Sequence, residues 1–185
     1  MKKISCGKKE IILGQRTLIM GILNVTPDSF SDGGKYNNLD SAMEQAEKLI
    51  SEGADIIDVG GESTRPGHVQ ITSEEEISRV VPIIEKISKN LNTIISIDTY
   101  KYDVAEAAIK AGANIINDIW GLQYDNGEMA ELVKKSNLPI IVMHNQNDEI
   151  YSKDIMLSLR EFFEKTYKIA NKYGIDRDKI ILDPG

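Results

Sequence analysis

Short apolar runs separated by longer amphipathic segments form the main pattern of this sequence. The runs are rich in isoleucine and do not alternate with polar residues, as is typical of strands buried on both faces of a parallel sheet. The predicted strands are residues 18–23, 55–59, 93–97, 114–117, 139–143 and 179–182. Because helical patterns lie between them, the sequence predicts repeated βα units and a parallel sheet.

Apolar residues at helical spacing predict the helices. Residues 38–53 carry one apolar face, made of Leu39, Ala42, Met43, Ala46, Leu49 and Ile50. Further helices are predicted at residues 72–90, 102–112, 127–137 and 152–174. Gly53 and Gly112 each follow a predicted helix, at the position where a glycine commonly ends one.

The helix at residues 72–90 has two special features. Its start shows a capping-box pattern, Ser73 to Glu76, and we interpret the acidic residues Glu74 to Glu76 as complementing the helix dipole. Pro82 lies inside the pattern, which predicts a kink or a later start.

Two architectures fit about six βα units, an open doubly wound sheet or a barrel of eight units. The open sheet usually shows a glycine-rich phosphate turn, which this sequence lacks. Residues 2–16 predict a β-hairpin that turns near Gly7 and covers the bottom of the sheet. We therefore expect one domain over residues 1–185, a TIM (β/α)8-type barrel with an N-terminal hairpin and about the first six βα units, incomplete at its C-terminus.

Composition narrows the function classes. A formal charge of −7 argues against nucleic acid or an anionic membrane as the main partner. Cys6 is the single cysteine, so no internal disulfide forms and a reducing compartment is favoured. The N-terminus lacks the apolar region of a signal peptide, and Gln15 and Arg16 interrupt the apolar segment that follows. We expect a cytoplasmic protein.

Polar residues end the predicted strands. They are Asn24, Asp58 or Glu62, Asp98, Asn117 with Asp118, His144 and Asp183. One such residue is usually structural, but in parallel α/β folds functional groups gather where strands end. A ring of carboxylates and amides in a barrel mouth suits a heterocycle with N–H donors and ring acceptors.

Six sequence blocks resemble, in order and spacing, the signature blocks of the dihydropteroate synthase family. They read GILNVTPDSFSDGG, DVGGESTRPG, SIDTYK, IINDIWG, IVMHN and ILDPG. The resemblance implies a transferase of folate biosynthesis that joins dihydropterin pyrophosphate to p-aminobenzoate and releases pyrophosphate. It also implies an SN1-like course, in which pyrophosphate departs before the arylamine attacks.

The resemblance also implies roles for individual residues. Asp98, Asn117 and Asp183 would hydrogen-bond the pterin edge and act in catalysis, by stabilising the developing positive charge. Ile119 and Met143 would pack on the ring faces. The cofactor implied is Mg²⁺, with Asn24 as its protein contact near the pyrophosphate.

Two loops would bind p-aminobenzoate. The first contributes Thr26, Pro27 and Phe30, and the second contributes Thr64, Arg65 and Pro66. The family continues for about two more βα units, which supply a lysine to the pterin and an Arg-x-His to the pyrophosphate. The family is homodimeric mainly through its last helices, so dimerisation is not expected of these 185 residues.

Two alternatives remain open at this stage. One is a truncated pterin-binding protein without activity, and the other is the pterin-binding module of a methyltetrahydrofolate–corrinoid methyltransferase. The second would not be expected to carry both p-aminobenzoate loops, so these loops favour the synthase.

Overall fold

A parallel sheet forms the centre of the chain. The computed structural model describes residues 2–26, 35–63, 70–146 and 154–185. The strands of the sheet are β3 (Met20–Asn24), β4 (Ile56–Gly60), β5 (Ile94–Asp98), β6 (Ile115–Asp118), β7 (Ile140–Met143) and β8 (Ile180–Asp183). Each pairs in parallel with the next one along the chain, in the order β3-β4-β5-β6-β7-β8. Open doubly wound sheets reverse this order at a switch point, whereas a barrel wall does not. The expected partial barrel is confirmed.

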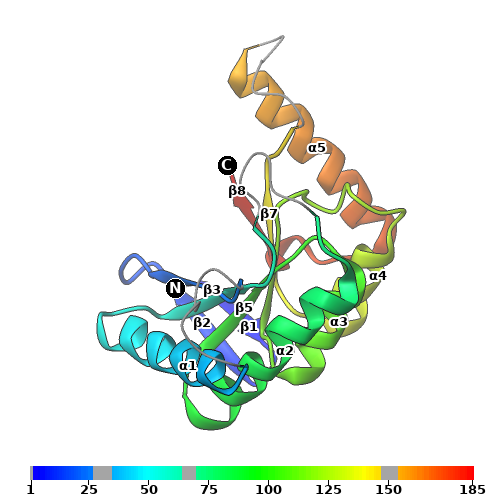
Figure 1. Cartoon of the computed structure of the whole chain (residues 1–185). Coiled ribbons are helices and arrows are strands. Elements are labelled where there is room, and N and C mark those ends of the chain that lie inside the picture. Colours follow the sequence, from blue (N-terminus) through cyan, green and yellow to red (C-terminus); the bar gives the residue numbers. More distant parts are fainter. Residues whose placement is uncertain (1, 27–34, 64–69, 147–153) are drawn as a thin grey trace.

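Helices follow the strands around the outer face of the sheet (Figure 1). They are α1 (Lys35–Ser51), α2 (Ser73–Asn90), α3 (Tyr102–Ala111), α4 (Glu128–Ser136) and α5 (Ile155–Tyr173), with a short 3-10 turn, η2 (Arg177–Lys179), before β8. Ala42, Met43 and Ala46 of α1 are buried, as the apolar face at residues 38–53 predicts. They pack in one core with outward side chains of the strands, such as Ile57 and Val59 of β4.

The start of α2 differs from the prediction. Thr72 is the N-cap, because its side chain accepts a hydrogen bond from the backbone N–H of Glu75. The expected capping box from Ser73 to Glu76 is therefore wrong by one residue. Pro82 lies inside the helix, so the later start is also wrong, since the first turn is held by its cap.

An antiparallel hairpin closes the amino-terminal end of the sheet. It consists of β1 (Lys2–Cys6) and β2 (Lys9–Leu13), and Gly7 turns it with a φ of 72° that glycine adopts without strain. Its buried residues Ile4, Cys6 and Ile11 pack against strand residues of the sheet, Ile56, Ile115 and Ile141. The hairpin thus covers one end of the barrel wall, as the sequence predicts.

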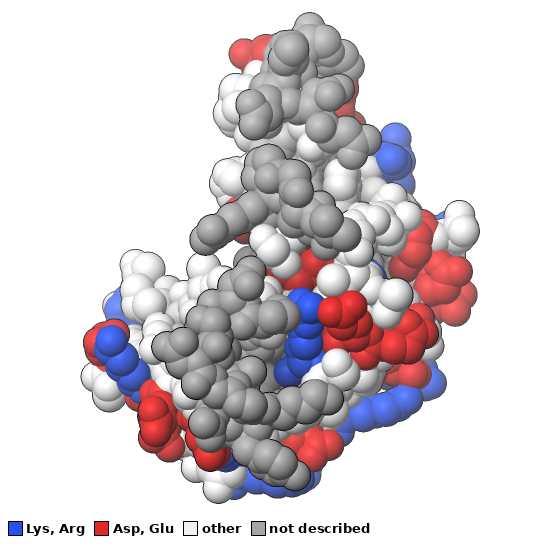
Figure 2. Space-filling model, in the orientation of Figure 1, with Lys and Arg blue, Asp and Glu red and all other residues white. Residues whose placement is uncertain are grey.

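Several charges on the described helices form ion pairs along their surfaces. Red and blue groups lie next to one another on the described part of the face in Figure 2. Pairs four residues apart include Arg79 with Glu75 on α2 and Lys110 with Glu106 on α3. Among the described helices, each falls short of a membrane span in length or in apolar content.

The hairpin gives a test of core packing with a neighbouring control. Ile11 is 4% exposed, whereas Ile12 is 36% exposed. Ile11→Ala should lower the free energy of unfolding by about 2–5 kcal/mol, because it leaves a cavity under the sheet. Ile12→Ala should cost less than about 1 kcal/mol. Urea denaturation of both variants measures the difference, and equal losses would contradict the packing described.

Candidate active site

One row of residues crosses four neighbouring strands at their carboxyl ends. The parallel register aligns Asn24 of β3 with Gly60 of β4, Gly60 with Asp98 of β5, and Asp98 with Asn117 of β6. Side chains alternate along a strand, so Gly60 shares a face with Ile56, the residue that contacts the hairpin. The row therefore lies on the inner face of the barrel wall, at the end opposite the hairpin.

Gly60 keeps the centre of this row open. A Cβ atom at this position would lie 3.2 Å from Asn24 Oδ1 and 3.3 Å from Asp98 Oδ2. Both oxygens therefore border the open position at Gly60. An amide oxygen and a carboxylate oxygen side by side are hard donors, which suit either a divalent cation or the N–H groups of a ligand.

Asp58 lies on β4, two residues before Gly60, and fixes the side chain of Asn117. The Asn117 amide Nδ2 donates to Asp58 Oδ2 at 3.0 Å, and Asp58 is buried. Asp58 Oδ1, Ser96 Oγ and Asp98 Oδ1 are buried without a hydrogen-bond partner in the described part of the chain. Buried polar atoms are nearly always paired with protein, water or ligand. Their clustering on β4 and β5 marks this as a place where water or a ligand would complete the hydrogen bonding.

Electrostatics single out Asp98 within the row. Burial, together with the charges of Asp58, Glu76, Asp118 and Glu62, raises its pKa to about 7. Burial also raises the pKa of Asp58, against the opposing effect of its polar neighbours Ser96 and Asn117. The site therefore favours ligands that bring N–H donors or positive charge, since either one stabilises the ionised carboxylate.

Asp118 has a structural role. Its carboxylate accepts from the backbone N–H of Trp120 at 2.8 Å and of Leu122 at 2.7 Å, which holds the turn after β6. Burial raises the pKa of Asp118 to about 6, while these backbone hydrogen bonds lower it. Ile119 lies in this turn, directly after the strand that carries Asn117.

Met143 and Asp183 are paired at the ends of β7 and β8. Asp183 Oδ1 accepts from the N–H of Gly185 at 3.0 Å, and the Asp183 backbone oxygen accepts from the N–H of His144 at 2.9 Å. His144 is buried edge-on against Phe162, with ring centroids 5.1 Å apart, which is a packing role. The sheet thus places both predicted pterin contacts at the same carboxyl end as the row.

The remaining predicted residues divide into two groups. Thr26 is the last residue described after β3 and is half-buried. Pro27, Phe30, Thr64, Arg65 and Pro66 lie outside the described residues, so their assignment to p-aminobenzoate stays a prediction. Within the described ranges, no three His, Cys, Asp or Glu side chains are grouped as metal ligands.

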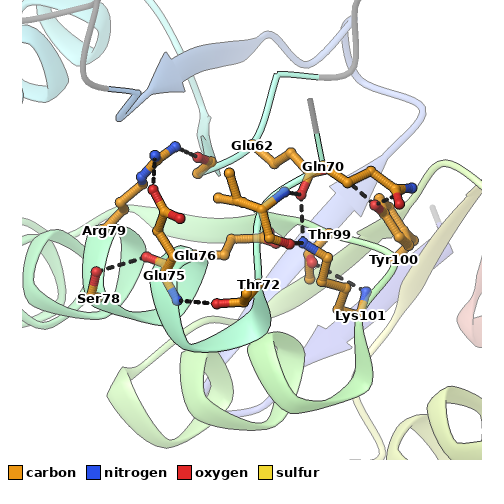
Figure 3. Close-up of polar contacts among 12 residues, drawn as sticks. Glu62, Gln70, Thr72, Glu75, Glu76, Ser78, Arg79, Thr99, Tyr100 and Lys101 are labelled. Carbon is orange, nitrogen blue, oxygen red and sulfur yellow. Dashed lines mark hydrogen bonds and ion pairs between the residues drawn. The ribbon is translucent and has the colours of Figure 1, made fainter. Parts of the chain in front are cut away.

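A buried charged cluster beside the row was not predicted. Lys101, after β5, contacts Glu62, after β4, and Glu76 of α2 (Figure 3). The sequence pattern indicates only a dipole role for Glu76 and no role for Lys101. The available signal was the block SIDTYK, which ends in Tyr100 and Lys101 just past Asp98.

A cavity of about 220 Å³ lies at the other end of the sheet, beside the hairpin. Its lining includes Arg16 and Asp55, whose side chains pair with each other, with Arg16 Nη1 donating to Asp55 Oδ2 at 2.7 Å. Because these charges satisfy one another, the row at the carboxyl ends is the stronger candidate site.

A parallel barrel wall with carboxylates and amides gathered at its carboxyl ends is typical of α/β-barrel proteins that carry a binding site at that end. Comparison with known families agrees with this class. The chain belongs to the pterin binding enzyme family, whose sequence profile matches residues 20–185.

Individual relatives are dihydropteroate synthases. The enzyme of Clostridium beijerinckii is 53% identical over 97% of this chain. The structure of a dihydropteroate synthase from Clostridium difficile with pteroic acid is 53% identical over 93% of the chain, with a TM-score of 0.89. That of Xanthomonas albilineans with 4-aminobenzoic acid is 38% identical over 99%, with a TM-score of 0.92. The chain spans 66%, 65% and 66% of the lengths of these three proteins.

The raised pKa of Asp98 predicts a stability gain in Asp98→Asn that depends on pH. Between pH 3.8 and about 7 the unfolded carboxyl is ionised while the folded one keeps its proton, so the wild type loses stability as pH rises through this window. Asparagine does not ionise, so the variant does not lose this stability as the pH rises. The free energy of unfolding of the variant minus that of the wild type should therefore increase from pH 5 to pH 8, by about 1.4 kcal/mol for each unit of pKa shift expressed. Melting temperatures of both proteins at the two pH values measure this difference.

Asp55→Asn is the control, because the opposite effect on stability is expected for it. The hydrogen bond from Arg16 holds the pKa of Asp55 below its usual value, so its stabilising effect is present at neutral pH and is lost on acidification. This variant should be less stable than the wild type at pH 8. A pH-independent effect of Asp98→Asn would contradict the environment described for Asp98.

Proposed function

We propose that the protein is a dihydropteroate synthase. It would condense 6-hydroxymethyl-7,8-dihydropterin pyrophosphate with p-aminobenzoate to give 7,8-dihydropteroate and pyrophosphate. The row of Asn24, Asp98 and Asn117 on adjacent strands carries this proposal, because it offers the acceptors and donors that a pterin edge requires. The identity of 53% to a named dihydropteroate synthase supports it independently.

In the proposed mechanism the chain binds the pterin edge through Asp98, Asn117 and Asp183. The bond between the CH2 carbon and the pyrophosphate oxygen breaks with its electron pair on oxygen. The cation that forms is delocalised into the pterin ring, where the ionised carboxylate of Asp98 stabilises it in a setting already arranged for that charge. The amine nitrogen of p-aminobenzoate then attacks the carbon and loses a proton.

The residues present also fit a magnesium ion. Asn24 is exposed at the end of β3, and its Oδ1 lies over the open position at Gly60. Mg²⁺ takes few protein oxygens and completes its shell with water and substrate phosphates, so one amide oxygen is a suitable contribution. When bound, the ion would neutralise charge on the departing pyrophosphate.

One alternative agrees less well with these findings. A corrinoid methyltransferase module would share the pterin contacts but not the similarity to named synthases at 53% identity. The proposed partners are thus the two small-molecule substrates. The proposed location is the cytoplasm, which the single cysteine favours.

The activity is tested with full-length protein. Supplied with the pterin pyrophosphate and p-aminobenzoate, it should form dihydropteroate and release one pyrophosphate for each product, and only when Mg²⁺ is present. Chromatography of the product and a coupled pyrophosphate assay measure both. Absence of dihydropteroate with Mg²⁺ would rule out the proposed function.

Asp98→Asn tests the pterin site. Because a hydrogen bond to a charged group contributes about 1.5–3 kcal/mol, the variant should bind the pterin substrate roughly 10–100-fold more weakly, as measured by calorimetry. Asp103→Asn makes the same chemical change on the exposed start of α3 and should leave the affinity unchanged. Unchanged affinity in Asp98→Asn would remove Asp98 from the site.

A further inference from the structure

A carboxylate inside the barrel wall sets the orientation of the Asn117 side chain. Asn117 Nδ2, on β6, donates to Asp58 Oδ2, on β4, at 3.0 Å, and β5 lies between these two strands. Asp58 is only 5% exposed, whereas Asn117 is partly exposed. The hydrogen bond thus runs from a residue of the row to a carboxylate that water hardly reaches.

Asp58 lies one layer deeper in the barrel than the row. The register pairs Asp58 with Ser96, two residues before the pair of Gly60 with Asp98. Two residues along a strand span about 6.6 Å and return to the same face of the sheet. The hydrogen bond therefore draws Nδ2 of Asn117 toward the hairpin and leaves its Oδ1 on the side of the carboxyl end.

The chemistry of Asp58 determines which atom of the amide it holds. A carboxylate oxygen accepts hydrogen bonds, so it binds the N–H of an amide and not its oxygen. Ser96, the register partner of Asp58, is fully buried and carries a hydroxyl group. Ser96 and Asn117 both oppose the rise that burial causes in the pKa of Asp58, which is the effect that donors have on a carboxylate. Asp58 thus acts as an acceptor toward its neighbours.

With its Nδ2 held in this way, Asn117 presents its amide oxygen next to Asp98, its partner in the register. Asp98 Oδ1 is buried and has no hydrogen-bond partner in the described part of the chain. Two acceptors on neighbouring strands suit a ligand edge that brings N–H donors. If the amide turned by half a rotation, an N–H would take the place of the oxygen and would face the N–H of such a ligand.

We propose that Asp58 is a positioning residue for the pterin substrate. It holds the amide oxygen of Asn117 toward the ligand before the ligand binds, so that the row selects a heterocycle edge with an N–H donor at that place. Asp58 acts through Asn117 and does not contact the substrate. Supporting hydrogen bonds of this kind keep a binding group in its productive orientation. The inference rests on the proposed function, and the residues that carry it all lie in the described ranges.

Two substitutions of Asp58 and one control test this in full-length protein. Asp58→Leu keeps a similar volume and removes the acceptor, whereas Asp58→Asn keeps an acceptor oxygen in a side chain of the same shape. Thr93→Val is the control, because it removes a buried hydroxyl group just before β5, at the end of the sheet opposite the row. Each substitution is also made together with Asn117→Ala, which removes the amide through which Asp58 acts.

The expected result is a loss of pterin affinity that depends on Asn117. Asp58→Leu should raise the Kd for the pterin pyrophosphate about three- to tenfold, the scale of one hydrogen bond, as measured by calorimetry with Mg²⁺ and without p-aminobenzoate. Asp58→Asn and Thr93→Val should change this Kd less than twofold. In the Asn117→Ala background, Asp58→Leu should cause no further increase. A further increase there would overturn the inference, and so would an equal loss in Asp58→Asn.

Side-chain NMR of the wild type without substrate gives a readout that serves even if Asp58→Leu does not fold. With isotope-labelled asparagine, the two Nδ2 protons of Asn117 are identified as the signals that Asn117→Ala lacks. The proton bonded to Asp58 should exchange with water more slowly than the other, and in Asp58→Leu the two rates should become similar. Equal rates in the wild type would overturn the inference at any pterin affinity. A wild type that does not bind the pterin pyrophosphate refutes the proposed function instead.

Discussion

The register of the parallel sheet is the constraint on which the candidate site depends. It places Asn24, Gly60, Asp98 and Asn117 in one row across four strands. A slip of one residue in β5 would turn Asp98 toward the helices and Ile97 into the barrel. Apolar side chains on both faces prevent this, because the inner set meets the hairpin and the outer set meets the helices. The same packing that forms the core thus positions the polar groups.

The two ends of the sheet differ in polarity. At the amino-terminal end, Ile56, Ile115 and Ile141 are closed off by the hairpin and stabilise the fold by ordinary apolar burial. At the carboxyl end, Asp58 and Asp98 are shielded from water close to each other, and both pKa values are raised. Such an arrangement costs stability in the absence of ligand, and it is retained where a bound group supplies the missing donors or charge.

Much of this architecture could be predicted from the sequence because it follows local periodicity. The run at residues 55–59 corresponds to β4 at Ile56–Gly60, and residues 102–112 to α3 at Tyr102–Ala111. The role of Glu76 could not be predicted in this way. Its position in the first turn of α2 fits a dipole pattern, while its actual partner, Lys101, lies 25 residues later on another element. Asn117 and Asp118 both lie at the end of a strand, and the sequence alone does not tell which one faces the site. Side chains alternate along a strand, so the amide of Asn117 points inward while the carboxylate of Asp118 holds the turn that follows.

The end of β5 joins the row of the candidate site to the buried charged cluster over a very short stretch of chain. Asp98 faces the pterin row, and Lys101 holds the connection from β4 to α2. The backbone between them has little freedom, because the N–H of Thr99 donates to Asn117 O at 3.0 Å and the N–H of Lys101 donates to Thr99 Oγ1 at 3.2 Å. Only Thr99 and Tyr100 separate Asp98 from Lys101 along the chain. The row and the buried charged cluster are thus joined by one strand end, so any coupling between them needs no extended network of side chains.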